Sequence, residues 1–500
     1  MELHVFSFPF LFTFLLFIFM VVKIGKRFKT NHSTLNLPPG PWKLPIIGNI
    51  HQFVGSLPHR ALRDMASKHG PLMHLQLGEV STIVVSSPEF AKEVMKTHDV
   101  TFASRPSILV SKILSYDSTN IGFAPYGNYW RQLRKICTLE LLSQKRVESY
   151  QPIREEELST LISWIGSKAG STINLTEKMF TTTCSITSRA AFGKKCKDQE
   201  KFISIVKQSL ELSAGFNIAD LFPSVKLLHL VSGVRTNLER LHQEADRIMG
   251  NIINEHKEQK ATKKTDENVR AEDLIDVLLK FHQEHSSDSE FSLTISNIKA
   301  VILDIFSAGS ETSATTVDWA MSEMIKNPRV MKKAQAEVRE VFNRKGKVDE
   351  TCINEMKYLN SVVKETLRLH APVPLLLPRE CGERCKLKGY EIPIKTKVIV
   401  NAWAIGRDPK YWNEAEKFYP ERFLDSSIDY KGTNFEYIPF GAGRRICPGI
   451  TFGLANVELP LALYLMKNED LDMTEAFGIT VRRKDDLQLI PIAYHPLPVV

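Results

Sequence analysis

The spacing of hydrophobic residues predicts a chain that is mostly helical. Apolar residues recur every three to four positions, the period of a helix with one buried face, over four long stretches. These stretches are 154–165, 238–258, 294–326 and 354–370. The charged segment at 255–273 overlaps the end of the second stretch and predicts a mobile surface connection.

Shorter patterns predict a small β portion. Apolar runs at 72–77 and 80–85 flank a Gly-Glu pair and predict a β-hairpin, after which Ser87-Pro88 predicts the start of a helix. Prolines are frequent beyond residue 372, where short β-like runs such as 397–400 alternate with turns. The fold class expected from these patterns is mainly α with a small β portion.

The first 45 residues predict a membrane anchor and a linker. Residues 5–22 carry no charge and include seven Phe, which is close to the minimum length for crossing a bilayer. A cleaved signal peptide is the alternative, but its basic start is missing because Glu2 stands there. Basic residues from 23 to 29 place the following chain in the cytosol. We expect a transmembrane anchor at 1–24 and a basic linker with a proline-rich hinge at 25–45.

Composition excludes several classes of protein. The 500 residues are 43% hydrophobic and 24% charged, which excludes a disordered or collagen-like chain. The net charge of +8 is too small and too scattered for a nucleic-acid-binding protein. Seven cysteines, an odd number in a cytosolic domain, predict free thiols. Cys381 and Cys385 lack the second Cys or His pair of a zinc site, so we expect a structural role for them.

The strongest chemical signal is the loop FGAGRRICPG at 440–449, which precedes an apolar, helix-like run. A cysteine just before a helix has its thiolate stabilised by unpaired N–H groups, and thiolate binds metal. Gly443 and Gly449 let the backbone approach a flat ligand. Arg445 offers a cation to a carboxylate, and Phe440 shields the sulfur of Cys447. A haem-thiolate site needs these components, whereas the alternative is a glycine-rich loop with a buried cysteine.

A second signal lies inside the predicted helix 294–326. Ala308 and Gly309 precede an acid and an alcohol there, Glu311 and Thr312. Glycine in a helix interior costs about 1 kcal/mol relative to alanine, and a closely bound ligand explains that cost. Glu311 and Thr312 could then relay protons to the ligand. In the alternative, the threonine hydroxyl only bonds back to a helix carbonyl.

Two further pairs each share a helix face. Trp130 and Arg134 are four residues apart and present an indole N–H and a guanidinium, although a solvated basic face is the alternative. Glu365 and Arg368 are three apart, and as an isolated pair they predict a surface ion pair of little energetic value.

Taken together, the chain resembles a plant microsomal cytochrome P450, a haem-thiolate monooxygenase. The resemblance covers nearly the whole chain and is carried, in order, by LPPGPWKLPIIGN, YGNYWRQLRKIC, AGSETS, KETLRLHAPVPLLLPREC, NAWAIGRDPKYW, PERF and FEYIPFGAGRRICPG. It implies the cytochrome P450 fold for residues 46–500, haem b as cofactor and Cys447 as the axial iron ligand. It also implies that four residues lie near the haem propionates, namely Trp130, Arg134, Arg379 and Arg445.

The resemblance gives roles to other residues as well. It places Ala308 and Gly309 at the cofactor and assigns Glu311 and Thr312 to oxygen activation. It makes Glu365, Arg368 and Arg422 a buried structural ion network instead of a surface pair. Segments that it implies face the substrate are 108–121, 212–222, 301–308, 371–377 and 476–479.

The implied reaction inserts one atom of O2 into a lipophilic plant specialised metabolite. Electrons come from NADPH through NADPH-cytochrome P450 reductase, because the chain has no flavin or nicotinamide fingerprint, and a cytochrome b-type donor is a further possible partner. We expect a terpenoid substrate, with an indole alkaloid or another aromatic compound as the alternative. The implied location is the endoplasmic reticulum membrane, with a single span and a cytosolic catalytic domain.

Three different functions are also considered. A haem isomerase or dehydratase of the same fold would not need the helix alcohol Thr312, and nothing in the sequence adds the signalling domain of a non-catalytic haem sensor. A third possibility is an impaired variant, because the chain after Met466 is shorter than the family pattern before its final hairpin.

Overall fold

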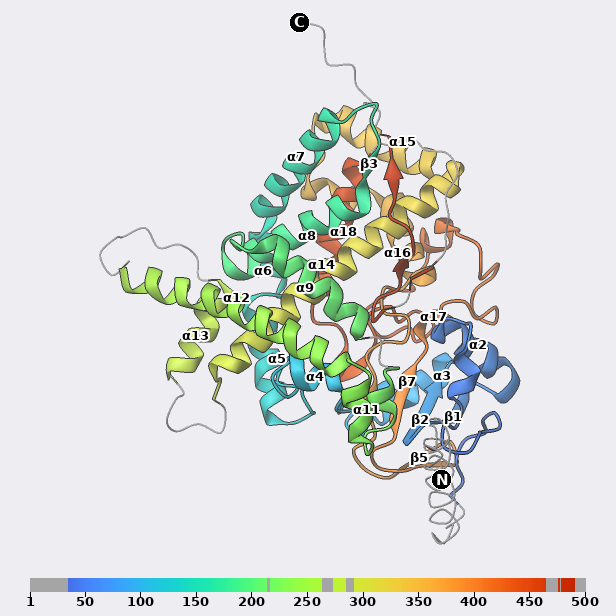
Figure 1. Ribbon diagram of the computed structural model, residues 1–500. Helices are drawn as coiled ribbons and strands as arrows, with labels where there is room; N and C mark the ends of the chain where they lie inside the picture. Colours follow the sequence, from blue (N-terminus) through green and yellow to red (C-terminus); the bar gives the residue numbers. More distant parts are fainter. Residues whose placement is uncertain are drawn as a thin grey trace, which may run out of the picture.

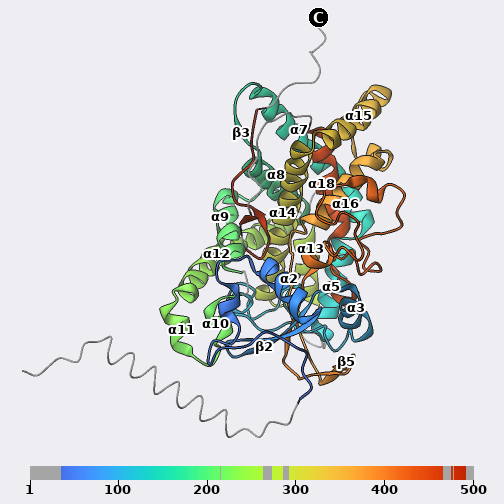
Figure 2. The ribbon, with the colours of Figure 1, turned by 90° about the vertical axis from the view of Figure 1, so that its right-hand side faces the viewer.

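The computed structural model describes residues 35–213, 216–262, 273–284, 292–464, 475–476 and 478–490. The expected anchor at 1–24 and part of the linker lie outside these residues. Within the described ranges, no helix is both long and apolar enough to cross a membrane. A large helical body and a smaller sheet region make up the molecule, which confirms the predicted fold class (Figure 1 and Figure 2).

Helix α14 (Ile295–Lys326) runs through the centre of the helical body (Figure 1). Thr294 caps its first turn by accepting a hydrogen bond from the Asn297 N–H, while the Asn297 side chain accepts one from the Thr294 N–H. Because neighbouring helices cover α14 on most sides, its buried residues are not confined to one stripe. These neighbours include α8 (Leu175–Phe192), α12 (Val234–Thr262), α16 (Lys357–Leu369) and α18 (Ile450–Leu463).

Shorter helices complete the body. They are α2 (Pro58–His69), α3 (Pro88–Lys92), α4 (Leu109–Leu114), α5 (Asn128–Glu140), α6 (Gln144–Ser149), α7 (Gln151–Ser167), α9 (Gln199–Leu212), α10 (Ile218–Leu221), α11 (Lys226–Val231), α13 (Leu274–Glu284), α15 (Pro328–Lys345) and α17 (Ala402–Ile405). Short 3₁₀ or π turns lie at η1 (Ile50–Phe53), η2 (Glu93–Thr97), η3 (Glu350–Glu355), η4 (Pro420–Phe423) and η5 (Gly443–Arg445).

A four-stranded sheet lies beside α2 and has the order β1-β2-β7-β4. The predicted hairpin forms as expected, because β1 (Leu72–Leu77) and β2 (Val80–Val85) pair antiparallel around Gly78. Strand β7 (Lys397–Val400) joins β2 in parallel, and β4 (Arg379–Glu380) closes the other edge. Three two-stranded pairs are β3 (Ile173–Asn174) with β10 (Gln488–Leu489), β5 (Cys385–Leu387) with β6 (Tyr390–Ile392), and β8 (Glu475–Ala476) with β9 (Arg482–Arg483).

Two predicted boundaries are wrong. The stretch 354–370 is not one helix, since η3 ends at Glu355 and α16 begins at Lys357, with the buried Met356 between them. The charged segment from 255 is helical as far as Thr262, because Glu255 pairs with Lys194 and with Lys197 at 2.8 Å. The remainder of that segment, 263–272, lies outside the described residues.

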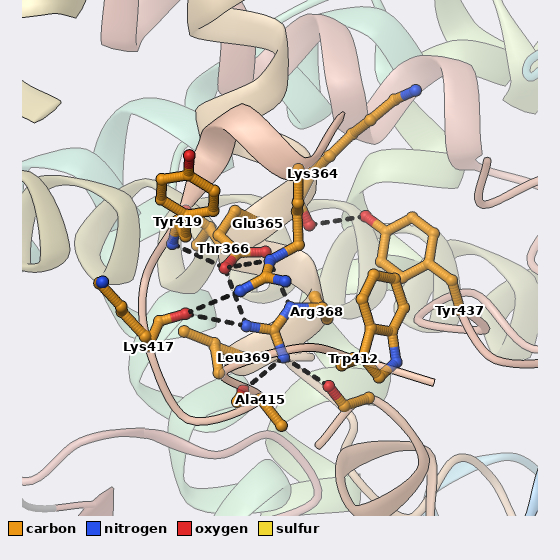
Figure 3. A network of polar contacts seen from close by, with 12 residues as sticks. Lys364, Glu365, Thr366, Arg368, Leu369, Trp412, Ala415, Lys417, Tyr419 and Tyr437 are labelled. Carbon is orange, nitrogen blue, oxygen red and sulfur yellow. Dashed lines mark hydrogen bonds and ion pairs between the residues drawn. The ribbon is translucent and has the colours of Figure 1, made fainter. Parts of the chain in front are cut away.

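Glu365, Arg368 and Arg422 form a buried ion network, so the surface-pair interpretation is wrong (Figure 3). Glu365 is 0% exposed and Arg368 is 1% exposed. The Glu365 carboxylate accepts two hydrogen bonds of 2.8 Å from Arg368, one from Arg422 and one from the Tyr419 N–H. Arg368 also donates to the carbonyls of Gly406, Ala415 and Lys417, which fixes the loop-rich segment that leads to the cysteine loop.

Candidate functional site

Cys447 lies between η5 and the start of α18, as the sequence predicts. Its backbone N–H donates to the Phe440 carbonyl at 3.0 Å, which closes the loop. Burial raises the pKa of the thiol, while the Gly449 N–H and the Arg134 cation act in the opposite direction. A metal ion bound to the sulfur would favour the thiolate further.

Trp130 and Arg134 come from α5 and meet Arg445 of the cysteine loop. The Arg445 guanidinium lies 4.0 Å from the centre of the Trp130 ring, and that of Arg134 lies 5.4 Å from it. The Trp130 N–H donates to the Ile121 carbonyl at 3.0 Å, and Arg445 donates to the carbonyls of Ala103 and Ala124. The structure thus brings Arg445 next to Trp130 and Arg134, although more than 300 positions separate them in the sequence.

Arg379 joins the same cluster from β4. It donates to the Ala442 carbonyl at 2.9 Å and lies 3.5 Å from Asp99. Burial lowers the pKa of Arg379 to about 10 and, together with Arg379 and Arg134, lowers the pKa of Arg445 to about 9. These directions show cations that are crowded together away from water.

Sequence reasoning missed two members of this cluster, Arg105 and Asp304. Arg105 is buried and donates to the carbonyls of Gly122, Leu377 and Pro378 at 2.7–3.0 Å. Asp304 of α14 accepts from the Gly122 N–H at 2.9 Å, and burial raises its pKa to about 6. No local pattern marks either residue, because their partners lie up to 273 positions away in the sequence.

The charge of the cluster decides which ligand fits. Four guanidinium groups lie around only two carboxylates, Asp99 and Asp304, and Asp99 also contacts the exposed guanidinium of Arg444 at 3.7 Å, so positive charge is in excess. Buried charge of one sign needs a partner of the other sign. The two propionates of haem b carry two negative charges, so the donor set fits this cofactor with Cys447 as the iron ligand. The four guanidinium groups belong to Arg105, Arg134, Arg379 and Arg445.

The middle of α14 carries the acid and the alcohol that the sequence assigns to the site. Ala308 is exposed, although Phe306 and Ser310 on either side of it are fully buried. The Thr312 hydroxyl donates to the Ala308 carbonyl at 2.7 Å, as the local alternative predicts. Glu311 is buried, which raises the pKa of its carboxyl, and it accepts a hydrogen bond from Thr480 at 3.3 Å.

Gly309 and Gly443 are explained by packing. A Cβ on Gly309 would lie 3.3 Å from the Phe452 ring and 3.4 Å from Thr187, so the glycine lets α14 approach α8 and α18. Helix packing is therefore a second reason for the glycine, beside the close ligand that the sequence suggested. Gly443 has a φ of +71°, and its Cβ would lie 2.0 Å from the Met95 carbonyl oxygen, so it seats the loop on η2. Contact of either residue with the cofactor stays a prediction.

The other loop residues are consistent with a shielded sulfur. Phe440 packs edge-on against Tyr430, with the ring centres 5.6 Å apart. A Cβ on Gly449 would lie 3.9 Å from the Cys447 sulfur, which is an ordinary contact distance.

An apolar pocket lies near the site. Four of the five segments predicted to face the substrate contribute to it, whereas 301–308 does not line it. Its walls include Ile108, Phe123, Ser213, Phe216, 373–378 and 478–479.

The comparison with known families decides the identification. The family model described as Cytochrome P450 matches residues 38–469. The chain belongs to the cytochrome P450 family. This P450 is therefore an enzyme, a monooxygenase with haem iron as its cofactor and O2 and NADPH-derived electrons as its co-substrates. The resemblance drawn from the motifs is confirmed.

Several similar proteins are plant P450s. Cytochrome P450 71D11 of Lotus japonicus is 60% identical over 95% of this chain and 99% of its own length. Tabersonine 16-hydroxylase 1 of Catharanthus roseus is 56% identical over 96% and 97%. Premnaspirodiene oxygenase of Hyoscyamus muticus is 52% identical over 98% and 99%.

A solved structure shares the fold. A zebra fish cytochrome P450, in a structure with abiraterone, superposes with a TM-score of 0.73. The match covers 88% of this chain and 100% of that chain at 24% identity, and it shows the fold alone.

Proposed function

We propose that this P450 hydroxylates a lipophilic plant terpenoid. The observation that carries the proposal is the pocket, whose walls are apolar except for Ser213 and Lys397. The likeness to premnaspirodiene oxygenase supports a terpenoid substrate. Apolar walls bind such a molecule by burying its surface, which contributes about 25 cal/mol per Å².

The residues of the site have different roles in the proposed reaction. Haem iron, when bound, would supply the activation of O2, and the Cys447 thiolate would hold the iron. Arg105, Arg134, Arg379 and Arg445 would hold the propionates. Thr312, held by the Ala308 carbonyl, presents its hydroxyl oxygen at the exposed turn of α14. Glu311 is adjacent in sequence, and burial raises the pKa of its carboxyl, which favours the protonated form that a proton relay needs.

An indole-alkaloid hydroxylase is the second candidate. The tabersonine hydroxylase is more similar in sequence than the terpene oxygenase, at 56% against 52% identity. The isomerase and non-catalytic alternatives receive no support, because the family membership gives a monooxygenase. Impairment by the shortened segment after Met466 stays a prediction, since residues 465–474 lie outside the described residues.

The partner and the location are part of the same proposal. We expect NADPH-cytochrome P450 reductase as the electron donor, with a cytochrome b-type protein as a further donor. Exposed basic residues of α5 and α6, among them Arg131, Lys135 and Lys145, offer a docking surface for an acidic partner. The apolar segment at 5–22 supports a single span in the endoplasmic reticulum membrane with a cytosolic catalytic domain.

Turnover with candidate substrates tests the function. The full-length protein is reconstituted with reductase and NADPH and is offered a sesquiterpene olefin or tabersonine. The proposal predicts a product 16 mass units heavier than the olefin, about one oxygen atom, together with NADPH consumption that the olefin stimulates. Oxidation of tabersonine but not of terpenes would move the assignment to the alkaloid candidate.

A further inference from the structure

Two of the seven free cysteines, Cys381 and Cys385, lie together where the chain passes from β4 to β5. Cys381 is fully buried in a hydrophobic cluster, and Cys385 packs against the same cluster while remaining partly exposed. The residues between them, 382–384, are all exposed. This turn therefore places one thiol in the core and a second thiol beside it at the surface.

The two sulfur atoms meet at the β5–β6 hairpin. Its register pairs Cys385 with Ile392, and the Cys381 sulfur lies 3.9 Å from the Ile392 carbonyl oxygen. The side chains of Cys381 and Cys385 also share a hydrogen bond. A disulfide forms without backbone movement only where two cysteines lie close together and their side chains face each other. These two thiols meet that condition, because their side chains already touch.

Backbone hydrogen bonds hold the turn in this shape. The Cys381 N–H donates to the Thr396 carbonyl at 2.9 Å, and the Gly382 N–H donates to the Thr101 carbonyl at 2.8 Å. The Thr101 hydroxyl in turn donates to the Glu383 carboxylate at 2.8 Å. Because both the strand and the turn are fixed, the two thiols stay within reach of each other.

The two thiols differ in acidity as well as in access to solvent. The hydrogen bond from Cys381 lowers the pKa of Cys385, although burial and the charge of Glu383 act in the opposite direction. The same contact, together with burial, raises the pKa of Cys381. Cysteines that react with oxidants are accessible, have a lowered pKa and lie next to a second cysteine. Cys385 has these three properties, and Cys381 is the second cysteine.

We propose that Cys385 and Cys381 form a redox site that hydrogen peroxide converts reversibly to a disulfide. The Cys385 thiolate first attacks peroxide, so that an S–O bond forms, the O–O bond breaks and hydroxide leaves and is protonated to water. The Cys381 sulfur then attacks the Cys385 sulfur, so that the S–S bond forms, the S–O bond breaks and a second water leaves with the Cys381 proton. Two electrons pass from the two thiols to peroxide. The proposal does not depend on which substrate the enzyme oxidises.

Peptide mapping of the haem-loaded, full-length protein tests this proposal. Peroxide is raised stepwise without substrate or NADPH, the remaining free thiols are alkylated after denaturation, and the protein is digested with trypsin without reduction. Trypsin cleaves after Arg384, so a disulfide would join peptide 380–384 to peptide 385–386. We expect this joined peptide at the lowest peroxide dose at which any cysteine loses its free thiol. Dithiothreitol added before alkylation should restore both thiols.

Cys196 is the control within the same molecule, since it is also partly exposed but burial raises its pKa. It should still be alkylated at the dose that yields the joined peptide. Cys381→Ser should leave Cys385 as a sulfenic acid that dimedone labels, whereas Cys385→Ser should leave Cys381 unreacted at that dose. Earlier loss of the thiol of Cys196 or of another cysteine, or oxidation of Cys385 in the wild type without the joined peptide, would overturn the proposal. The wild-type map decides the question even if a variant does not fold.

Discussion

Replacing Glu365 by Gln should destabilise the protein far more than a surface substitution of the same kind. The carboxylate is fully buried and accepts four hydrogen bonds, two of them from Arg368 and one from Arg422. Gln removes the negative charge and leaves the Arg368 guanidinium, which is 1% exposed, facing only backbone carbonyls. Breaking a buried pair in this way costs about 3–5 kcal/mol of unfolding free energy.

The exposed pair of Arg235 and Glu239 provides the control. These residues are four apart on α12, their side chains are 50% and 45% exposed, and their atoms lie 2.7 Å apart. Glu239→Gln should cost about 0.3–0.5 kcal/mol, because water screens an exposed pair. Urea titrations followed by tryptophan fluorescence and by haem absorbance compare the two variants. Similar losses for both would refute the reasoning that burial makes the Glu365 network structural.

Four further predictions address other parts of the molecule. Thr312→Ala should retain haem and substrate but release more peroxide per NADPH, because a hydroxyl beside the site is lost; equal product per NADPH would remove Thr312 from the mechanism. Burial disfavours the charged form of His256, but the hydrogen bond and charge of Asp273 outweigh it and raise the pKa of His256 above 6.5. The stabilisation is complete below the unfolded-state pKa and is lost as pH rises through the folded-state pKa, so His256→Gln should flatten the dependence of melting temperature on pH above 6.5. Coupling to the reductase should weaken with rising salt, since exposed charges are screened within about 8–10 Å, and a salt-independent affinity would contradict docking at Arg131 and Lys145. Restoring a family-length segment after Met466 should raise haem retention and melting temperature, and no change in either would show that the short chain closes without it.

Local patterns in the sequence were sufficient for elements whose causes are local. The hairpin around Gly78, the helix predicted at 294–326 and the cysteine loop before α18 all depend on neighbouring residues, and the structure contains each of them. The spacing of Glu365 and Arg368 was also visible, but their burial depends on the loop at 406–419 that folds over them.

Long-range contacts account for what local patterns could not show. Arg105 and Asp304 interact with segments more than a hundred positions away, so no periodicity marks them. The sequence shows a glycine inside the predicted helix 294–326, at Gly309. It does not show that Phe452 and Thr187 of two other helices approach that position.

The central claim is that Cys447 supplies the thiolate ligand of haem iron. The reduced carbon monoxide spectrum tests it directly, because a thiolate ligand gives a spectrum different from that of other axial ligands. Wild type and Cys137→Ala, which removes a buried cysteine of α5, should both show the thiolate spectrum, whereas Cys447→Ala should lose it. A thiolate spectrum that survives in Cys447→Ala would contradict the account.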